Sequence, residues 1–178
     1  MPRADSLPSR PNWPTLRRML GDRRGVALVE FALVAPVFLL LVLMIVEDGL
    51  LLFTQAQLDN ATRDAARSIL IGTFQTGGRG LGDFQTAVCD GIAGMIPSCS
   101  GKVQVYAETD GVSAGNLTTA PSGYWDGTSG TFNVGGPSQY MIIQVGYAYP
   151  YVSRWLAAMS GNSVMLVSTV VFQVEPYQ

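Results

Sequence analysis

An apolar run of 21 residues, Val26 to Val46, limits most strictly what this chain can fold into. It contains one charged side chain, Glu30. As an α-helix it would be about 30 Å long, which matches the hydrocarbon core of a bilayer. Arginines precede the run, and Glu47 and Asp48 follow it. The positive-inside rule therefore predicts one membrane span, with the N-terminus in the cytoplasm and the chain after residue 48 outside.

Glu30 is the unusual residue of this run. A carboxylate inside hydrocarbon costs up to about 3 kcal/mol and is by default a candidate functional group. Glu30 lies four residues after Val26, so both share one helix face. If the chain were cut after Gly25, the free amine of Val26 would be protonated near neutral pH and would pair with Glu30 on its own or a neighbouring chain. The alternative is a glutamate solvated at the headgroup boundary.

Three motifs in and after this run resemble the TadE-like family, minor pseudopilins of the Tad (tight adherence, Flp) pilus machinery. The first is GVALVEFALVAP from Gly25 to Pro36, which also has the pattern of the class III signal of type IV pilins. The second is Glu47 with Gly49, and the third is QAQLDNATRDAAR at 55–67. The detailed match covers about residues 23–70, and TadF, a close relative in the same system, fits the same motifs.

The resemblance implies processing and a set of partners. A prepilin peptidase would cut between Gly25 and Val26, and Glu30 with Phe31 would serve assembly and recognition. The small Flp pilins carry Glu-Tyr at these two positions, whereas this chain has Glu30-Phe31. The implied partners are the peptidase, other pilins and pseudopilins, the Tad inner-membrane assembly platform and the lipid bilayer.

The 178 residues leave room for the membrane helix and one compact domain. We expect a basic cytoplasmic leader at 1–25, a membrane helix at 26–46, its extracytoplasmic continuation at 47–71 and an extracytoplasmic domain at 72–178. A removable secretory signal is not expected, because the apolar run is too long and no small-x-small cleavage site follows it before Glu47. Pro36 inside the run is expected to kink or loosen the helix.

The patterns after the span predict an α+β domain with an antiparallel sheet, similar to pilins. A stripe of apolar residues continues the long helix and is interpreted as core packing within the chain, with Gly72 as its stop: Leu51, Leu58, Ala61, Ala65 and Ile69. Further helices are predicted at Leu81–Met95 and around Val152–Met159, and the glycines between 72 and 82 predict a flexible loop. Alternating residues predict strands at Lys102–Glu108, Gln139–Tyr149 and Ser163–Val174.

Cys89 and Cys99 are the two cysteines of the chain. In an oxidising compartment a pair ten residues apart is expected to form a disulfide, which would add roughly 2–4 kcal/mol of stability. A catalytic pair would more typically be C-x-x-C, and a metal site would need more ligands. We therefore expect a structural crosslink.

Composition argues against several classes of function. Net charge is +4 before Val26, from six arginines and two aspartates, and −6 from Val26 onward, from five basic and eleven acidic residues. An acidic outer domain does not suit nucleic acid, which needs a basic surface. The chain has no histidine, so no hydrolytic site can be named, and we expect neither an enzyme nor a cofactor or catalytic metal.

The segment 110–136 is rich in glycine, serine and threonine and carries Tyr124 and Trp125. Its aromatic residues would either be presented to a partner or tucked against the sheet. Asp110, Asn116 and Asp126 offer oxygen ligands for calcium, but their spacing matches no known calcium loop.

Two functions follow from these observations. The first is a minor pseudopilin, cut after Gly25, that acts in the assembly, initiation or tip structure of a pilus for surface adherence. The second is an unprocessed single-span protein of the bacterial inner membrane whose outer domain binds an envelope or surface partner.

Overall fold

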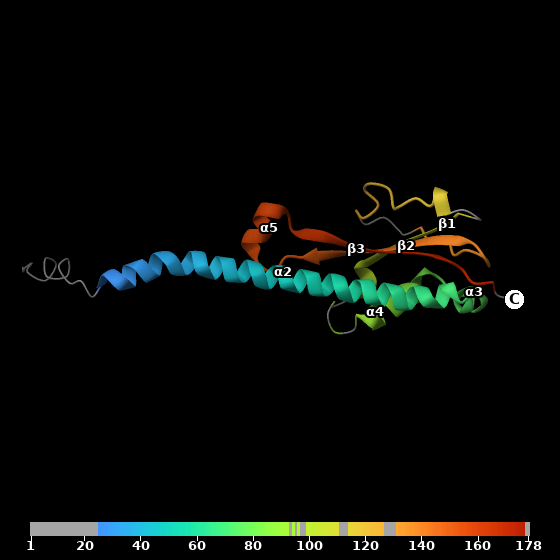
Figure 1. Cartoon of the computed structure of the whole chain (residues 1–178), viewed down its shortest axis with the longest axis horizontal. Coiled ribbons are helices and arrows are strands. Elements are labelled where there is room, and N and C mark those ends of the chain that lie inside the picture. Colours follow the sequence, from blue (N-terminus) through green and yellow to red (C-terminus); the bar gives the residue numbers. More distant parts are fainter. Residues whose placement is uncertain are drawn as a thin grey trace, which may run out of the picture. The chain divides into compact units, whose positions relative to one another are not determined.

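The structure, a computed structural model, describes residues 25–92, 94, 96, 99–110, 114–126 and 131–176. The helix α2 runs from Val26 to Leu70, and the α+β class predicted from the sequence is confirmed. The remaining helices are α3 (Thr73–Thr76), α4 (Leu81–Gly91) and α5 (Arg154–Ser160). The strands are β1 (Val103–Asp110), β2 (Tyr140–Pro150) and β3 (Ser163–Gln173), shown with the helices in Figure 1. The chain divides into an N-terminal unit up to Met44 and a C-terminal unit, Ile45–Gln178.

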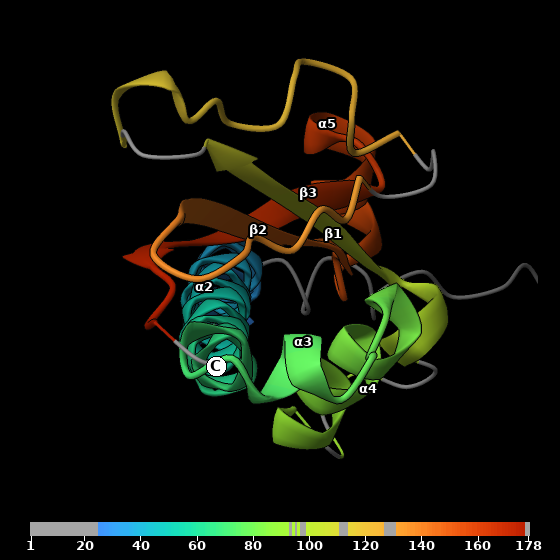
Figure 2. The same ribbon diagram turned by 90° about the vertical axis from the view of Figure 1, so that its right-hand side faces the viewer.

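The C-terminal unit is built on an antiparallel meander in the order β1-β2-β3. Val105 pairs with Val145 across the first ladder, and Val145 pairs with Ser168 across the second. Figure 2 shows α2, α3 and α4 below one face of the sheet and the loop between β1 and β2 above the other. Because β2 is the central strand and is covered on both sides, its side chains are buried at almost every position.

The core lies between the sheet and the helices. The stripe predicted on α2 supplies Leu58, Ala61, Ala65 and Ile69, all buried, which confirms that it packs within the chain. The odd-numbered residues of β2 from Met141 to Tyr149 face the same core. Phe74, Phe84 and Phe132 gather with ring centroids 5.7–6.2 Å apart.

Several predicted boundaries need correction. The helix predicted at Leu81–Met95 ends at Gly91, and Met95 lies outside the described residues. The loop predicted after Gly72 contains the short helix α3, whose Phe74 is buried in the core. Gly72 itself adopts φ 77°, a left-handed conformation that glycine accepts without strain and that suits the end of a helix.

Cys89 at the end of α4 and Cys99 form a disulfide, with Cα atoms 5.7 Å apart, as the sequence predicts. The bond joins α4 to the 3₁₀ turn that leads into β1. Close to it, a Cβ built on Gly91 would lie 2.8 Å from Cβ of Ala61, so α4 and α2 approach each other more closely there than any larger residue would allow. Small residues at both positions permit this contact.

Candidate functional site

Gly25 and Val26 stand at the point where α2 begins. Both are exposed, and a Cβ on Gly25 would meet no atom within 4 Å. Glu30 follows one turn later and is also exposed. Within the described part of the chain it has neither a hydrogen-bond partner nor an ion-pair partner. The carboxylate therefore has no partner within the described residues of its own chain.

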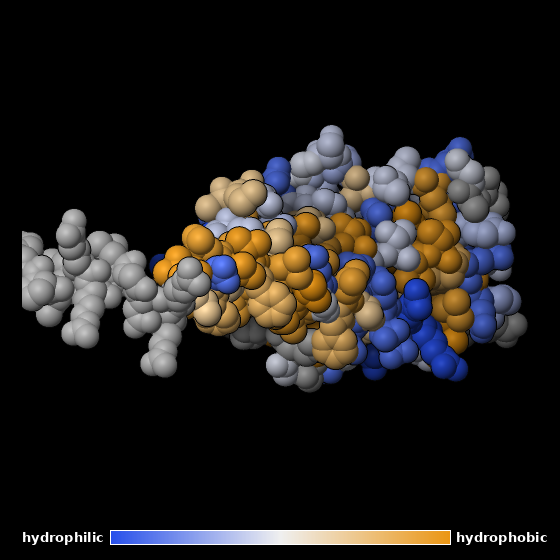
Figure 3. Space-filling view, turned by 60° about the vertical axis from the view of Figure 1, so that its left-hand side comes forward, coloured by the Kyte–Doolittle hydropathy of each residue, from blue (hydrophilic) through white to orange (hydrophobic). Residues whose placement is uncertain are grey.

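Apart from Glu30, the N-terminal part of α2 is apolar around its whole circumference. Its most apolar stretch has no buried residue, and α2 is the one helix within the described residues that is long and apolar enough to cross a membrane. Phe31 is 72% exposed. Figure 3 shows apolar side chains gathered over this part of the helix. In water such a surface costs about 25 cal/mol for each exposed Å², so the segment needs a lipid or protein environment.

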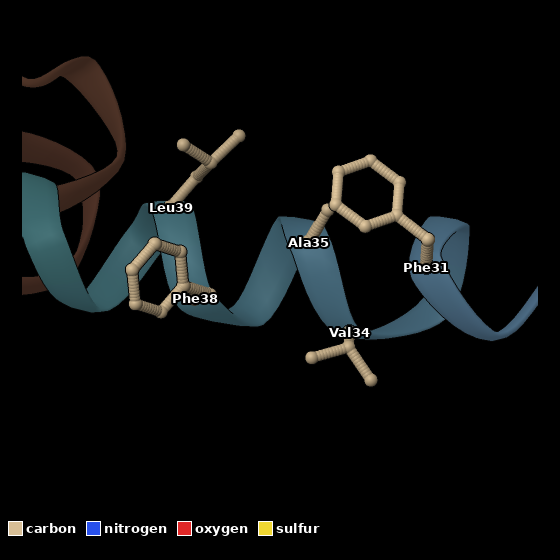
Figure 4. Close-up of a pocket in the computed structure, with 5 residues that line it drawn as sticks. All are labelled: Phe31, Val34, Ala35, Phe38 and Leu39. Carbon is tan, nitrogen blue, oxygen red and sulfur yellow. The ribbon is translucent and has the colours of Figure 1, made fainter. Parts of the chain in front are cut away.

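A shallow notch lies on this surface around Ala35. It is lined by apolar side chains only: Phe31, Val34, Ala35, Phe38 and Leu39. In Figure 4 the small Ala35 stands between the larger Phe31 and Leu39. A hollow between residues spaced by three and four positions is the geometry that receives a side chain from a neighbouring helix.

Pro36 adjoins the notch. Proline has no backbone N–H, so the carbonyl of Ala32 receives no bond from position 36. The helix nevertheless continues from Val26 to Leu70 without interruption. The kink expected at Pro36 stays a prediction.

Glu47 is a residue of the site whose role sequence reasoning missed. It directly follows the apolar run, yet it is only 5% exposed. Its Oε1 accepts a hydrogen bond from the backbone N–H of Val152 at 2.6 Å, and its Oε2 accepts one from Ser153 at 3.0 Å. These amides are free to donate because they lie beyond the end of β2 at Pro150. We refer to this arrangement, Glu47 with the amides of Val152 and Ser153, as the Glu47 anchor.

The anchor favours an ionised carboxylate. Burial acts to raise the pKa of Glu47, but the hydrogen bonds from Ser153 and Val152 outweigh it, and the pKa lies below its ordinary value. The negative charge of Glu47 also acts on Tyr149. The pKa of Tyr149 is raised, with burial as the larger cause and the charge of Glu47 as the second. A signal for this role exists in the sequence: the stripe of Leu51 and Leu58, extended back by one turn, reaches Glu47.

The loop between β1 and β2 keeps its aromatic residues on the sheet. Tyr124 is buried, and its hydroxyl donates to the carbonyl of Val105 at 2.7 Å. Trp125 lies against Gly146 of β2, where a Cβ would come within 2.4 Å of its ring. Of the two interpretations of this loop, the one in which Trp125 is tucked against the sheet is the one observed.

The candidate calcium ligands lie at the end of β1 and in the loop that follows it. Asp110 is the last residue of β1, whereas Asn116 and Asp126 lie in the loop between β1 and β2. Among the described residues, no group of three or more acidic, cysteine or histidine side chains could hold a metal ion. The chemistry available at the candidate site is that of a carboxylate with no partner among the described residues, an apolar helix surface and a buried, hydrogen-bonded glutamate.

One comparison with known proteins gives a match. The family model of TadE-like proteins matches residues 25–67, which include Gly25, Glu30, Glu47 and most of α2. No curated protein and no solved structure matches the chain. The match covers the segment whose motifs resemble that family, so residues 25–67 are similar to TadE-like proteins.

Proposed function

We propose that this protein is a minor pseudopilin of a Tad-type (type IVc) pilus. In this proposal a prepilin peptidase cuts after Gly25, and the mature chain begins with Val26 at the start of α2. The observation that carries it is Glu30: a carboxylate with no partner among the described residues, on an apolar helix one turn after Gly25, inside the segment that matches the TadE-like family model.

The electrostatics of the cut chain support this role. A carboxylate that faces hydrocarbon, as Glu30 would in the membrane, costs up to about 3 kcal/mol. Cleavage creates an ammonium group at Val26, and a pair of opposite charges gains more in a medium of low dielectric constant than in water. Since Val26 and Glu30 lie one turn apart, the pair forms within one helix or between two helices offset by about one turn. A pairing between chains would set the register of neighbouring helices.

The notch at Ala35 supports helix packing as the mode of assembly. In a membrane, helices associate through close contact at small residues, because lipid offers no hydrophobic driving force. The apolar helices of other pilins and pseudopilins are the natural occupants of this surface. The outer domain would then act in initiation, in tip structure or in adherence, with no catalytic role.

The proposal places the protein in the bacterial inner membrane, with its N-terminus in the cytoplasm and its C-terminal domain outside. The net charge of +4 before Val26 supports this orientation through the positive-inside rule. The assembly platform of the Tad system would contact the membrane helix during incorporation.

The test is the mature N-terminus together with a charge variant. In the native host, intact mass of the membrane-extracted protein is expected to show a chain that starts at Val26, and a bulky residue in place of Gly25 is expected to retain the leader. Glu30→Ala is expected to lower the number of pili while membrane insertion persists. Asp48→Ala, which removes an exposed carboxylate just after the apolar run, is the matched control and is expected to leave pili unchanged.

Two results would count against the proposal. A chain that still starts near Met1 would leave a single-span protein with an outer binding domain. Equal pilus numbers for the Glu30 variant and the wild type would remove the assembly role of the carboxylate.

A further inference from the structure

Helix α5 and the residue before it expose apolar side chains of the kind that a domain ordinarily buries in its core. The sequence predicts an amphipathic helix there, but no residue of α5 is buried. Val152, just before it, is 74% exposed and Met159 is 78% exposed, and these are the two largest exposed fractions among the large hydrophobic residues described. Trp155 and Leu156 are half-buried. A helix of this kind is incompletely covered by its own domain.

The Glu47 anchor places this exposed surface next to the end of the apolar run. The amides of Val152 and Ser153 both donate to Glu47, and Glu47 directly follows Val46, the last residue of the apolar run. If α2 crosses the bilayer from Val26 to Val46, Val152 lies within a few ångströms of the level at which the helix leaves the hydrocarbon.

The composition of α5 suits that level. Arg154 is exposed on α5 and is the only basic residue after Lys102 in the sequence. Exposed apolar side chains next to a cation and a tryptophan are the features of segments that lie in the plane of a membrane surface. A guanidinium group also matches the phosphates of lipid headgroups.

We propose that α5 rests on the outer surface of the same bilayer that α2 spans. Val152 and Met159 enter the boundary between headgroups and acyl chains, and Arg154 contacts phosphates. The proposal goes beyond the pilus role and depends only on the membrane span of α2. Through the Glu47 anchor, the lipid contact of α5 is coupled directly to the end of the span.

The experiment uses the full chain with one copy in each nanodisc. Both cysteines are in the disulfide, so a new cysteine is the only free thiol for an environment-sensitive fluorophore. Met159→Cys reports on α5. Val171→Cys is the matched control, an apolar residue that is 53% exposed. Val171 pairs with Ile142, eight residues along β2 from Pro150, which is about 27 Å away along the strand. Leu39→Cys reports on the span.

Nitroxide lipids then measure depth. For Met159→Cys we expect quenching by a nitroxide near the headgroup at least about twofold stronger than for Val171→Cys, because an interfacial helix sits at that depth. Leu39→Cys is expected to be quenched most by a nitroxide deep in the acyl chains. Adding Val152→Asp to the Met159→Cys chain is expected to weaken its quenching, whereas Val171→Asp is expected to leave it unchanged.

The controls distinguish a wrong placement of α5 from a wrong membrane span of α2. Equal, weak quenching of Met159→Cys and Val171→Cys, with Leu39→Cys quenched, would overturn the placement of α5 and leave the span intact. Loss of quenching at Leu39→Cys as well would overturn the span and with it the proposed membrane role. A label at position 159 that is shielded only when many copies share one vesicle would show that a second copy, rather than lipid, covers α5, and this also overturns the proposal.

Discussion

At the scale of a single residue, Glu47 shows that a charged side chain next to an apolar run need not lie on the surface. Sequence reasoning treats Glu47 and Asp48 alike, as the acidic end of the span, although the apolar stripe of Leu51 and Leu58, extended back by one turn, reaches Glu47 and not Asp48. In the fold Asp48 is exposed, whereas Glu47 accepts two backbone hydrogen bonds from residues more than a hundred positions away. A contact at such a separation depends on the path of β2, which local patterns do not specify.

Replacement of Glu47 by glutamine is expected to destabilise the C-terminal unit. The amide side chain keeps one acceptor oxygen but turns an N–H₂ group toward the second backbone donor. A buried amide left without an acceptor costs about 1–3 kcal/mol, so the free energy of unfolding should fall by that amount. Urea unfolding of the protein in detergent, followed by circular dichroism, measures it. Asp48→Asn is the control, and equal losses for both variants would contradict the importance of the anchor.

The anchor also predicts a pH dependence. Because hydrogen bonding lowers the pKa of Glu47 in the folded state, its contribution to stability is complete above the unfolded pKa, near 4.3, and is lost as pH falls through the lower folded pKa. The difference in unfolding free energy between the wild type and Glu47→Gln should therefore shrink as the pH is lowered below about 4. Glu108, whose pKa is lowered by hydrogen bonds from Tyr106 and Thr118, contributes to acid sensitivity in both proteins. A difference that is constant with pH would contradict this assignment.

At the scale of elements, periodicity predicts the long helix and all three strands, with ends displaced by a few residues. The strands are recognised because apolar residues alternate along them, as Val103 and Val105 do in β1. The helix α3 is missed because it has four residues and lies among glycines, where a single buried Phe74 gives no period to detect. The lack of burial in α5 is missed for another reason: periodicity identifies an apolar face but does not show what covers it.

The contact between α4 and α2 leads to a prediction at this scale. Gly91→Ala is expected to force the two helices apart, since its Cβ would lie 2.8 Å from Cβ and 3.2 Å from Cα of Ala61, atoms that cannot rotate away. Overpacking of this kind typically costs about 1–3 kcal/mol. Gly82→Ala in the same helix is the matched control, because a Cβ there meets nothing within 4 Å. Thermal unfolding should show a lower Tm for Gly91→Ala only, and equal Tm values would contradict the close contact.

At the scale of the whole molecule, the two units differ in whether their described residues form a buried core. All the buried residues named for the core lie at Glu47 or beyond, and the C-terminal unit contains the sheet, the disulfide and the Glu47 anchor. The N-terminal unit has an apolar surface and no comparable core among its described residues. From the sequence, composition and hydropathy predict an apolar membrane segment followed by one compact domain. That Glu47 belongs to the C-terminal unit depends on tertiary contacts and can be seen only in the fold.

A fragment that starts at Ile45 is therefore expected to fold without the rest of the chain, whereas one that starts at Gln55 should be less stable. The longer fragment retains Glu47, the half-buried Leu51 and the buried Thr54; the shorter one lacks all three, and the amides of Val152 and Ser153 lose their acceptor. Circular dichroism and urea unfolding in dilute detergent, which covers the exposed Leu52 and Phe53, compare the two. We expect a cooperative transition for the longer fragment and a lower midpoint for the shorter one.

A longer fragment that unfolds without cooperativity would show that residues before Ile45 are needed for folding, and equal midpoints would show that the turn of α2 around Glu47 contributes nothing to the stability of the domain.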